Sequence, residues 1–393
     1  MRKKFYIILF LYSFFCAKIM RDKVTKEIKI YGKEDDHGRH REFIRSWKST
    51  VSRYFNGGYV KDETRAKIQK VIEEYNYTPN AFARLNAKQS NVIGVVVPTL
   101  NSKITSRVIT SIDRYLREKG YTTLIQNSDH DIDQELQNIQ RLIQLNVDGI
   151  LISSIAITKD HKELLKKAGI PVVVLTQDYE DGISIIYDDY HAGKTIGEYI
   201  GKKGHQKVGY IGVYETDQAV GIERRNGVLD GLKEYGITPV TGKSDYSFIG
   251  GQTVTRELLE RESDLDAIIC ATDRLAFGAY KILHEHKKRI PEEVSVAAFG
   301  GYDESTLLTP ELTTLKFDSY GMGYLGAETI LKMITGEPVS KKQIVDMNLL
   351  KAEVSDHKFF ICAYNIALLP YYSERRALPF TCCFVKSSHI KHK

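Results

Sequence analysis

The chain has 393 residues, of which 42% are apolar and 27% charged. This is a globular composition, and the length allows one large domain beside a small one. The formal charge of +6 is unevenly distributed: ten basic residues stand against five acidic ones in 41–90, and 29 against 37 in 91–350. We therefore expect only the block 41–90 to meet a polyanion, and the acidic body to be excluded from that contact.

The N-terminal segment 1–47 matches no familiar pattern and is left unassigned. Met1-Arg-Lys-Lys4 precedes an apolar run from Phe5 to Cys16, which has the shape of a secretion signal. The run is too short to cross a bilayer as a helix, and no clear small-x-small cleavage site follows it. A signal peptide at 1–16 stays open as an alternative.

The cysteines, in contrast to this signal-like segment, favour a cytoplasmic protein. None of the five belongs to a Cys-x-x-Cys pair, and the long segment 91–350 holds Cys270 alone. This usage argues against a disulfide scaffold and against a zinc site, and it indicates a reducing cytoplasm. We expect no cofactor and no metal.

The block that follows is basic and helical. It contains a short helix from Lys48 to Phe55, a Gly57-Gly58 break, and a strong helix that opens at Asp62 with an apolar stripe. Asn80 can cap a further short helix. Hydroxyl and guanidinium groups on the first helix suit base edges and phosphates; the alternative is a solvated surface helix.

From Asn91 to about Leu350, strand-like apolar runs alternate with helical patterns, which predicts a parallel α/β sheet. The expected strands are 92–98, 122–126, 149–152, 172–175, 208–212, 266–270 and 294–299. The expected helices lie at about 104–116, 131–145, 190–203, 219–235, 250–261 and 273–286. These strands exceed one small sheet, so we expect two doubly wound lobes with a cleft between them.

Ligands of such sheets bind at the carboxyl ends of the strands. We therefore expect the cleft to be lined by the loops that start at Thr99, Gln126, Ser153, Thr176, Val213, Ala271 and Gly300. The pattern Gly321-x-Gly-x-x-Gly326 could suggest a dinucleotide site, but it lies near the end of the α/β region with little sheet expected after it. No arrangement typical of catalysis stands out, and we predict no enzyme.

Four segments of the basic block resemble the DNA-binding head of the LacI-type repressors: Lys48-Ser-Thr-Val-Ser-Arg53, Asn56-Gly-Gly-Tyr-Val60, Thr64-Arg65 and Tyr77-Thr-Pro-Asn-Ala81. The resemblance implies a helix in the major groove and a hinge helix that inserts an apolar side chain into the minor groove. The candidate DNA-binding residues are Lys48, Ser49, Thr50, Ser52, Arg53, Asn56, Asn80, Ala81, Arg84 and Leu85.

The head departs from the family pattern in two places. Glu42–Trp47 stands where the family has the end of a first helix and an Ala-Gly-Val-Ser turn. The hinge reads Ala83-Arg84-Leu85, one residue shorter than the usual Ala-Arg-Ser-Leu, and one deletion turns a helical side chain by about 100°. Whether this head folds and holds DNA stays open. We assign 48–78 to a partial helix-turn-helix head and 79–90 to a hinge helix and linker.

The resemblance continues through the body to about Leu350. Arg224-Arg-Asn-Gly227 matches the family's Arg-x-x-Gly, whose Arg binds the effector, and Ala271-Thr-Asp273 matches its Asn-Asp motif with Thr in place of Asn. The loops Tyr187–Tyr190 and Phe299–Asp303 resemble the sucrose operon repressors of Gram-positive bacteria, and Gly300 removes a frequent ligand carboxylate. The implied body, 91–350, is a two-lobed, periplasmic-binding-protein-like domain that binds effector and dimerises.

A sugar needs converging donors and acceptors and a flat apolar face. The candidate effector-binding residues are Ser102, Gln177, Asp189, Arg224, Tyr246 and Asp273. Each has an alternative: Arg224 can be a surface residue, Asp189 and Asp273 helix N-caps, and Tyr246 a core residue. A sugar and a sugar phosphate both suit a cleft that contains Arg224.

Two functions remain after these observations. The first is a cytoplasmic, homodimeric repressor of a sugar-utilisation operon that binds double-stranded operator DNA under the control of a sugar or sugar phosphate, without stable membrane association. The second is an exported sugar-binding protein for transport or chemosensing. Residues 351–393 are unassigned. Because both ends adjoin a good match abruptly, we hypothesise that frameshifts in the coding sequence altered them.

Overall fold

The computed structural model describes residues 50, 53–54, 58–74 and 89–352. The chain divides into two compact units, Met1–Gln89 and Ser90–Lys393. The expectations for the signal-like segment, the tail beyond residue 352 and most of the hinge lie outside the described residues. Within the described ranges, no helix is both long and apolar enough to cross a membrane.

The smaller unit contains helix α3 (Asp62–Glu74), which begins at the residue that the sequence predicts. Acidic Asp62 and Glu63 occupy its first turn, where the helix dipole favours negative charge. The Tyr54 hydroxyl donates a hydrogen bond to the Gln69 side chain, and the Arg65 guanidinium lies 5.6 Å from the centre of the Tyr54 ring. Tyr54 therefore packs against α3.

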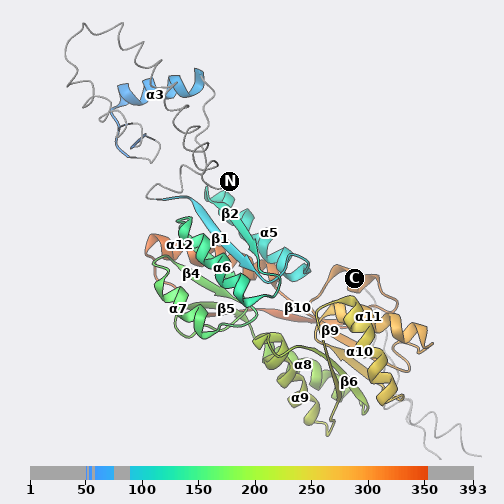
Figure 1. Ribbon diagram of the computed structural model, residues 1–393. Coiled ribbons are helices and arrows are strands. Elements are labelled where there is room, and N and C mark those ends of the chain that lie inside the picture. Colours follow the sequence, from blue (N-terminus) through green and yellow to red (C-terminus); the bar gives the residue numbers. More distant parts are fainter. Residues whose placement is uncertain (1–49, 51–52, 55–57, 75–88, 353–393) are drawn as a thin grey trace, which may run out of the picture. The chain divides into compact units, whose positions relative to one another are not determined.

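The larger unit contains two six-stranded sheets, each with helices packed on it (Figure 1). The first has the strand order β11-β5-β4-β3-β1-β2, and its strands are all parallel. Its strands are β1 (Val92–Val97), β2 (Thr122–Asn127), β3 (Gly149–Ser153), β4 (Val172–Leu175), β5 (Ile183–Tyr187) and β11 (Lys342–Val345). Central strands are continuously apolar because helices cover both faces of the sheet.

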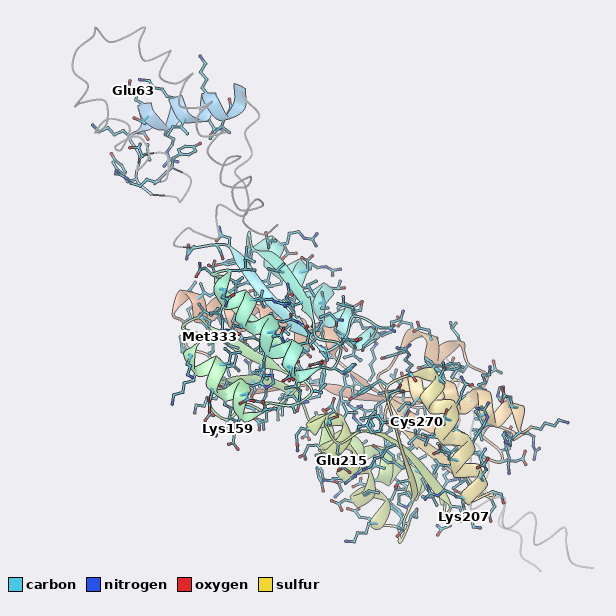
Figure 2. All side chains as sticks on the ribbon, in the orientation of Figure 1. Glu63, Lys159, Lys207, Glu215, Cys270 and Met333 are labelled. Carbon is cyan, nitrogen blue, oxygen red and sulfur yellow. The ribbon has the colours of Figure 1, made fainter. Side chains whose placement is uncertain are left out.

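The second sheet has the order β12-β10-β9-β8-β6-β7. It is parallel except for β12, which runs antiparallel to β10 at one edge. Its strands are β6 (Val208–Val213), β7 (Val240–Ser244), β8 (Ala267–Cys270), β9 (Ser295–Phe299), β10 (Thr313–Phe317) and β12 (Met347–Leu350). Side chains fill both lobes, and the thiol of Cys270 is buried and free within the second (Figure 2).

Helices pack on both sheets. The first lobe carries α5 (Lys103–Glu118), α6 (Ile132–Gln144), α7 (Lys159–Lys167) and α12 (Ser319–Thr335). The second carries α8 (Asp189–Lys202), a π-helical turn η1 (Gln218–Arg224), α9 (Arg225–Lys233), α10 (Phe248–Arg261), α11 (Asp273–Glu285) and a 3-10 turn η2 (Asp303–Leu307). The doubly wound, two-lobed α/β architecture is therefore confirmed.

The chain passes between the lobes three times. It leaves the first sheet at Asp188, which caps α8, returns at Asp318, which caps α12, and crosses again at Asp346 between β11 and β12. The Asp318 amide donates to the Asp346 carbonyl at 3.0 Å, so two of the crossings lie side by side. Three short crossings of this kind form a hinge about which two rigid lobes can rotate.

The structure also corrects several sequence expectations. Strands β5, β7, β10, β11 and β12 and helices α7 and α12 were not predicted, and the helix expected at 219–235 is divided into η1 and α9. The expectation that little sheet follows Gly321–Gly326 was wrong, since β11 and β12 follow it. Its glycines serve packing: a Cβ on Gly323 would lie 2.4 Å from the Val108 carbonyl of α5.

Candidate ligand-binding cleft

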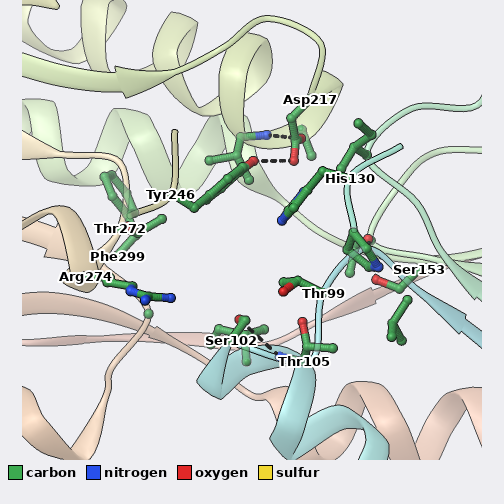
Figure 3. Close-up of a pocket in the computed structure, with 18 of the residues that line it drawn as sticks. Thr99, Ser102, Thr105, His130, Ser153, Asp217, Tyr246, Thr272, Arg274 and Phe299 are labelled. Carbon is green, nitrogen blue, oxygen red and sulfur yellow. Dashed lines mark hydrogen bonds between the residues drawn. The ribbon is translucent and has the colours of Figure 1, made fainter. Parts of the chain in front are cut away.

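A cleft of about 460 Å³ lies between the two lobes. Residues from both lobes face one another across it, including Thr99, Ser102 and Ser153 from the first and Tyr246, Asp217 and Arg274 from the second (Figure 3). The cleft opens at the carboxyl ends of the parallel strands. Loops after β1, β2, β3, β4, β6, β8 and β9 contribute to its wall, as the sequence predicts.

Arg224 is buried on the second-lobe wall, at the end of η1. Its Nε donates to Asp189 Oδ1 at 2.8 Å, its Nη2 donates to the same oxygen, and its Nη1 donates to the Ala271 carbonyl at 2.7 Å. The rings of Phe299 and Phe317 lie 4.9 and 5.0 Å from the guanidinium carbon, within cation–π range. Arg224 is therefore fixed in place by the lobe itself, which excludes the surface alternative.

Asp189 is the charge partner of Arg224. Burial raises the pKa of its carboxyl group, and the adjacent guanidinium opposes that rise. Asp188, not Asp189, caps α8 by accepting a hydrogen bond from the His191 amide at 3.0 Å. The capping alternative for Asp189 was therefore wrong, and its carboxylate instead orients Arg224 toward the cleft.

Asp217 forms a second polar centre, which sequence reasoning missed. Its Oδ2 accepts a hydrogen bond from the Tyr246 hydroxyl at 2.5 Å, and its Oδ1 accepts from the Val220 amide at 2.9 Å and from Gln177 Nε2 at 3.4 Å (Figure 3). Gln177 belongs to the first lobe and Asp217 to the second, so this group bridges the cleft. The available sequence signal was a carboxylate at the N-cap of a helix that begins beside the cleft.

The Tyr246 ring stacks on the ring of His130, with 5.2 Å between ring centres and 12° between their planes. His130 belongs to a turn after β2 in which Asp129 and His130 both have positive φ, 53° and 60°. Such a conformation is uncommon for residues with a side chain and often marks a functional turn. His130 was also missed, although Asp and His are among the residue types that adopt a positive φ more often than others.

Asp273 does not lie on the cleft wall. Its carboxylate accepts hydrogen bonds from the Tyr302 amide at 2.7 Å, the Ser305 hydroxyl at 2.9 Å and the Thr314 hydroxyl at 2.5 Å. Burial raises the pKa of this fully buried carboxyl group, and the three donors oppose the rise. Thr272, not Asp273, caps α11. The expectation that Asp273 offers a free acceptor to a ligand was therefore wrong. Its carboxylate lies behind the cleft wall and holds residues of that wall in place.

Ser102 of the first lobe and Gly300 of the second both line the cleft. Ser102 lines the wall and caps α5. Gly300 has φ 142°, and a Cβ there would lie 3.0 Å from the Tyr302 ring. Sequence reasoning missed Tyr302, whose half-buried side chain also lines the cleft. Its ring borders the space that a side chain at position 300 would occupy.

Direct contacts join the lobes around the cleft. The Gln218 amide donates to the Ile155 carbonyl at 2.9 Å. Arg107 of the first lobe donates to the Gly301 carbonyl at 3.0 Å and to Asp303 at 2.9 Å. Arg274 of the second lobe donates to the Asn101 carbonyl at 3.0 Å. These contacts hold the lobes in one relative arrangement, and a change at the hinge must break or rearrange them.

Of the expected DNA-binding residues, Thr50 and Arg53 are among the described residues. Both are helical; Thr50 is half-buried and Arg53 is exposed. The remaining candidates lie outside the described residues: Lys48, Ser49, Ser52, Asn56, Asn80, Ala81, Arg84 and Leu85.

These observations define a class of protein: a two-lobed ligand-binding body joined to a small helical head. Residues 93–338 match the family described as periplasmic binding protein domain, and residues 48–80 match the family described as bacterial regulatory proteins, lacI family. The chain belongs to the LacI family of transcription regulators.

Relatives and solved structures agree with this assignment. The chain is 30% identical to the sucrose operon repressor of Staphylococcus xylosus over 76% of its own length and 94% of that protein. It is 28% identical to the ribose operon repressor of Halalkalibacterium halodurans, over 74% and 88% of the two chains.

Two structural neighbours illustrate the fold. The lac repressor dimer bound to operator and the anti-inducer ONPF is similar with TM-score 0.71 and 24% identity, over 78% of this chain and 94% of that one. A LacI-family regulator from Enterococcus faecium with bound ribose is similar with TM-score 0.61 and 27% identity, over 67% and 98%.

Proposed function

We propose that this chain represses a sugar-utilisation operon and that a sugar or sugar phosphate in the interlobe cleft controls its affinity for duplex operator DNA. One observation carries the proposal: a single chain matches both the regulatory head, 48–80, and the ligand-binding domain, 93–338. A solute receptor needs the second and not the first, so the match at 48–80 favours a regulator over an exported sugar-binding protein.

The cleft supports a polyol as the ligand. Arg224 offers guanidinium donors, Gln177 and Ser102 can donate and accept, and the Tyr246 ring offers a flat face. Asp189 accepts hydrogen bonds from Arg224 and so positions it, and Asp273 accepts a hydrogen bond from the Tyr302 amide and so positions that residue. The relatives named as sucrose and ribose operon repressors, and the relative with bound ribose, favour the same ligand class.

The proposed domain scheme assigns 48–78 to the head, 79–90 to the hinge helix and linker, and 91–350 to effector binding and dimerisation. The head would contact operator DNA through the candidate residues between Lys48 and Asn56, and the hinge through those between Asn80 and Leu85. Residues 1–47 and 351–393 receive no role. The protein acts in the cytoplasm, and it is not an enzyme.

The mechanism is a shift between two lobe arrangements. A ligand that contacts both walls favours one arrangement by the difference of its affinities for the two. The three crossings at Asp188, Asp318 and Asp346 let the lobes rotate, and the rotation would change the spacing of the two heads in a homodimer. By reciprocity, operator DNA changes sugar affinity by the same factor.

The test is selection of duplexes by the full chain from a randomised pool, followed by gel-shift titration with and without fructose, sucrose and ribose. We expect salt-sensitive binding to a two-fold symmetric site and at least a tenfold change in affinity with one sugar. Sugar binding without any duplex binding would instead favour the exported receptor.

A matched variant addresses the short hinge. Insertion of one Ser between Arg84 and Leu85 restores the family's hinge length, so we expect it to raise duplex affinity without altering sugar affinity. Equal duplex affinity for the two chains would show that the missing residue does not limit DNA binding.

A further inference from the structure

The chain enters the larger unit at Ser90, just before β1, and the carboxylate of Asp148 holds the first two residues. The Ser90 amide and hydroxyl donate hydrogen bonds to Asp148 Oδ1 at 2.8 and 2.9 Å, and the Asn91 amide donates to Oδ2 at 2.8 Å. Ser90 is buried, and Asn91 has φ 53°, a conformation that Asn adopts more often than most residues. Hydrogen bonds to an ionised carboxylate are stronger than those between neutral groups. The entry point of the chain is therefore well fixed.

Asp148 ties this entry point to the first sheet, at the end of the sheet away from the cleft. It immediately precedes β3, and its own amide donates to the Val92 carbonyl at 2.8 Å. Strands β1 and β3 are parallel neighbours, and residues at their other ends, Val97 and Ser153, line the cleft. The six residues of β1 rise about 3.3 Å each, so the carboxylate lies about 20 Å from the ligand site.

The second lobe contains an equivalent carboxylate, Asp266, which immediately precedes β8. It accepts hydrogen bonds from the Gln206 amide at 2.9 Å and the Lys207 amide at 3.2 Å, just before β6, and its own amide donates to the Lys207 carbonyl at 2.9 Å. Strands β6 and β8 are parallel neighbours, as β1 and β3 are. The chain that reaches β6 comes from α8 of the same lobe, whereas the chain that reaches Ser90 comes from the head. Both lobes use the same device, and the one in the first lobe holds the segment joined to the head.

We propose that Asp148 is a positioning residue for DNA binding, because it holds Ser90 and Asn91 against β3 and so fixes where the segment joined to the head leaves the body. This inference rests on the proposed function, in which the two heads of a homodimer bind two half-sites at a set spacing. A fixed point of departure raises the effective concentration of the second head once the first is bound. Asp148 is not part of the cleft wall, so it acts on duplex affinity without acting on sugar affinity.

The test is Asp148→Asn in the full chain. The amide keeps the shape of the side chain but has one acceptor oxygen where the carboxylate has two, so at least one donor at Ser90 or Asn91 loses its partner. Fluorescence anisotropy measures affinity for a selected duplex, and isothermal titration measures affinity for fructose, sucrose and ribose. We expect duplex affinity to fall at least tenfold and the affinity for the sugar that binds to stay within twofold of the native value.

The other outcomes separate this inference from the proposed function. Unchanged duplex affinity, or an equal loss of duplex and sugar affinity, overturns the role given to Asp148 and leaves the repressor assignment intact. If none of the three sugars binds, the proposed sugar control fails, and the duplex comparison with the control variant decides the role of Asp148. If the native chain binds no duplex, the proposed function is overturned and this inference with it.

The matched control is Asp266→Asn, which removes the equivalent acceptor in the second lobe. We expect urea denaturation to show a similar loss of stability in the two variants, and the duplex affinity of Asp266→Asn to equal that of the native chain. Equal losses of duplex affinity in both variants would show that these carboxylates stabilise strand pairs and nothing more. A milder variant, Ser90→Ala, removes one of the three hydrogen bonds and should lower duplex affinity about threefold. If Asp148→Asn does not fold, unchanged duplex affinity in Ser90→Ala overturns the inference.

Discussion

The two walls of the cleft differ in kind. Among the residues that the structure describes, the first-lobe wall carries no Asp, Glu, Lys or Arg and combines short polar side chains such as Thr99, Ser102 and Ser153 with aliphatic ones. The second-lobe wall carries the buried Arg224, the carboxylates and most of the aromatic rings. We therefore expect substitutions on the second-lobe wall to cost more ligand affinity than substitutions on the first.

The strongest test of this asymmetry is Arg224→Met, which keeps apolar volume between the two phenylalanine rings. We expect sugar affinity to fall by at least tenfold. The free energy of unfolding should fall by about 3–5 kcal/mol, because Asp189 is left buried without a cation. Titration calorimetry and urea denaturation measure the two effects.

The control for Arg224→Met is Arg256→Met, which removes an exposed ion pair with Glu285 between α10 and α11. It should cost about 0–1 kcal/mol of stability and leave sugar affinity unchanged. Similar losses in the two variants would show that Arg224 contributes no more than a surface cation.

Asp273→Ala separates support of the second-lobe wall from contact with the ligand. Three donors lose their acceptor, and each buried donor left without a partner costs about 1–3 kcal/mol. We expect a large loss of stability in urea denaturation, and a smaller loss of sugar affinity through displacement of Tyr302. A stable Asp273→Ala variant that has lost sugar binding would return this carboxylate to the ligand-contacting set.

Single side chains on the two walls can be compared directly. Tyr246→Ala should lower sugar affinity about thirtyfold, because the ligand loses an aromatic face. Ser153→Ala should lower it about threefold, the value of one net hydrogen bond. Calorimetric titration with the same sugar gives both numbers. The reverse order of the two losses would contradict the asymmetry of the walls.

The smallest expected effect is that of Arg107→Ala, which removes two hydrogen bonds between the lobes and leaves the cleft wall intact. We expect a broader distribution of interlobe distances, measured by paired spin labels, and a two- to fivefold loss of sugar affinity. An unchanged distance distribution would show that this contact does not hold the lobes together.

The sequence predicted much of the body because its central strands are continuously apolar. β1, β3, β6, β8 and β9 are buried between helices and therefore read as uninterrupted runs. The missed strands include β7 and β11, which lie at sheet edges and carry polar residues such as Lys243 and Lys342. Because helices cover an edge strand less completely, polar residues interrupt its apolar run.

Part of the cleft could be predicted because some of its residues belong to short local motifs. Arg224 lies in a local motif, Arg-x-x-Gly, that can be found in one stretch of sequence. The correct role of Asp273 depends on Thr314, which lies 41 positions further along the chain. The stacking of His130 on Tyr246 depends on a turn with positive φ and on the approach of two lobes. No short motif encodes contacts of this kind.

The central claim is that ligand in the cleft controls the head. Its most direct test is fluorescence anisotropy of a labelled, selected duplex with the full chain, recorded while the tightest-binding sugar is added. We predict at least a tenfold change in duplex affinity for the native chain, and for Arg224→Met a response that needs at least tenfold more sugar at the same duplex occupancy. Duplex affinity that is independent of sugar in the native chain, at sugar concentrations that saturate the cleft, would contradict the account.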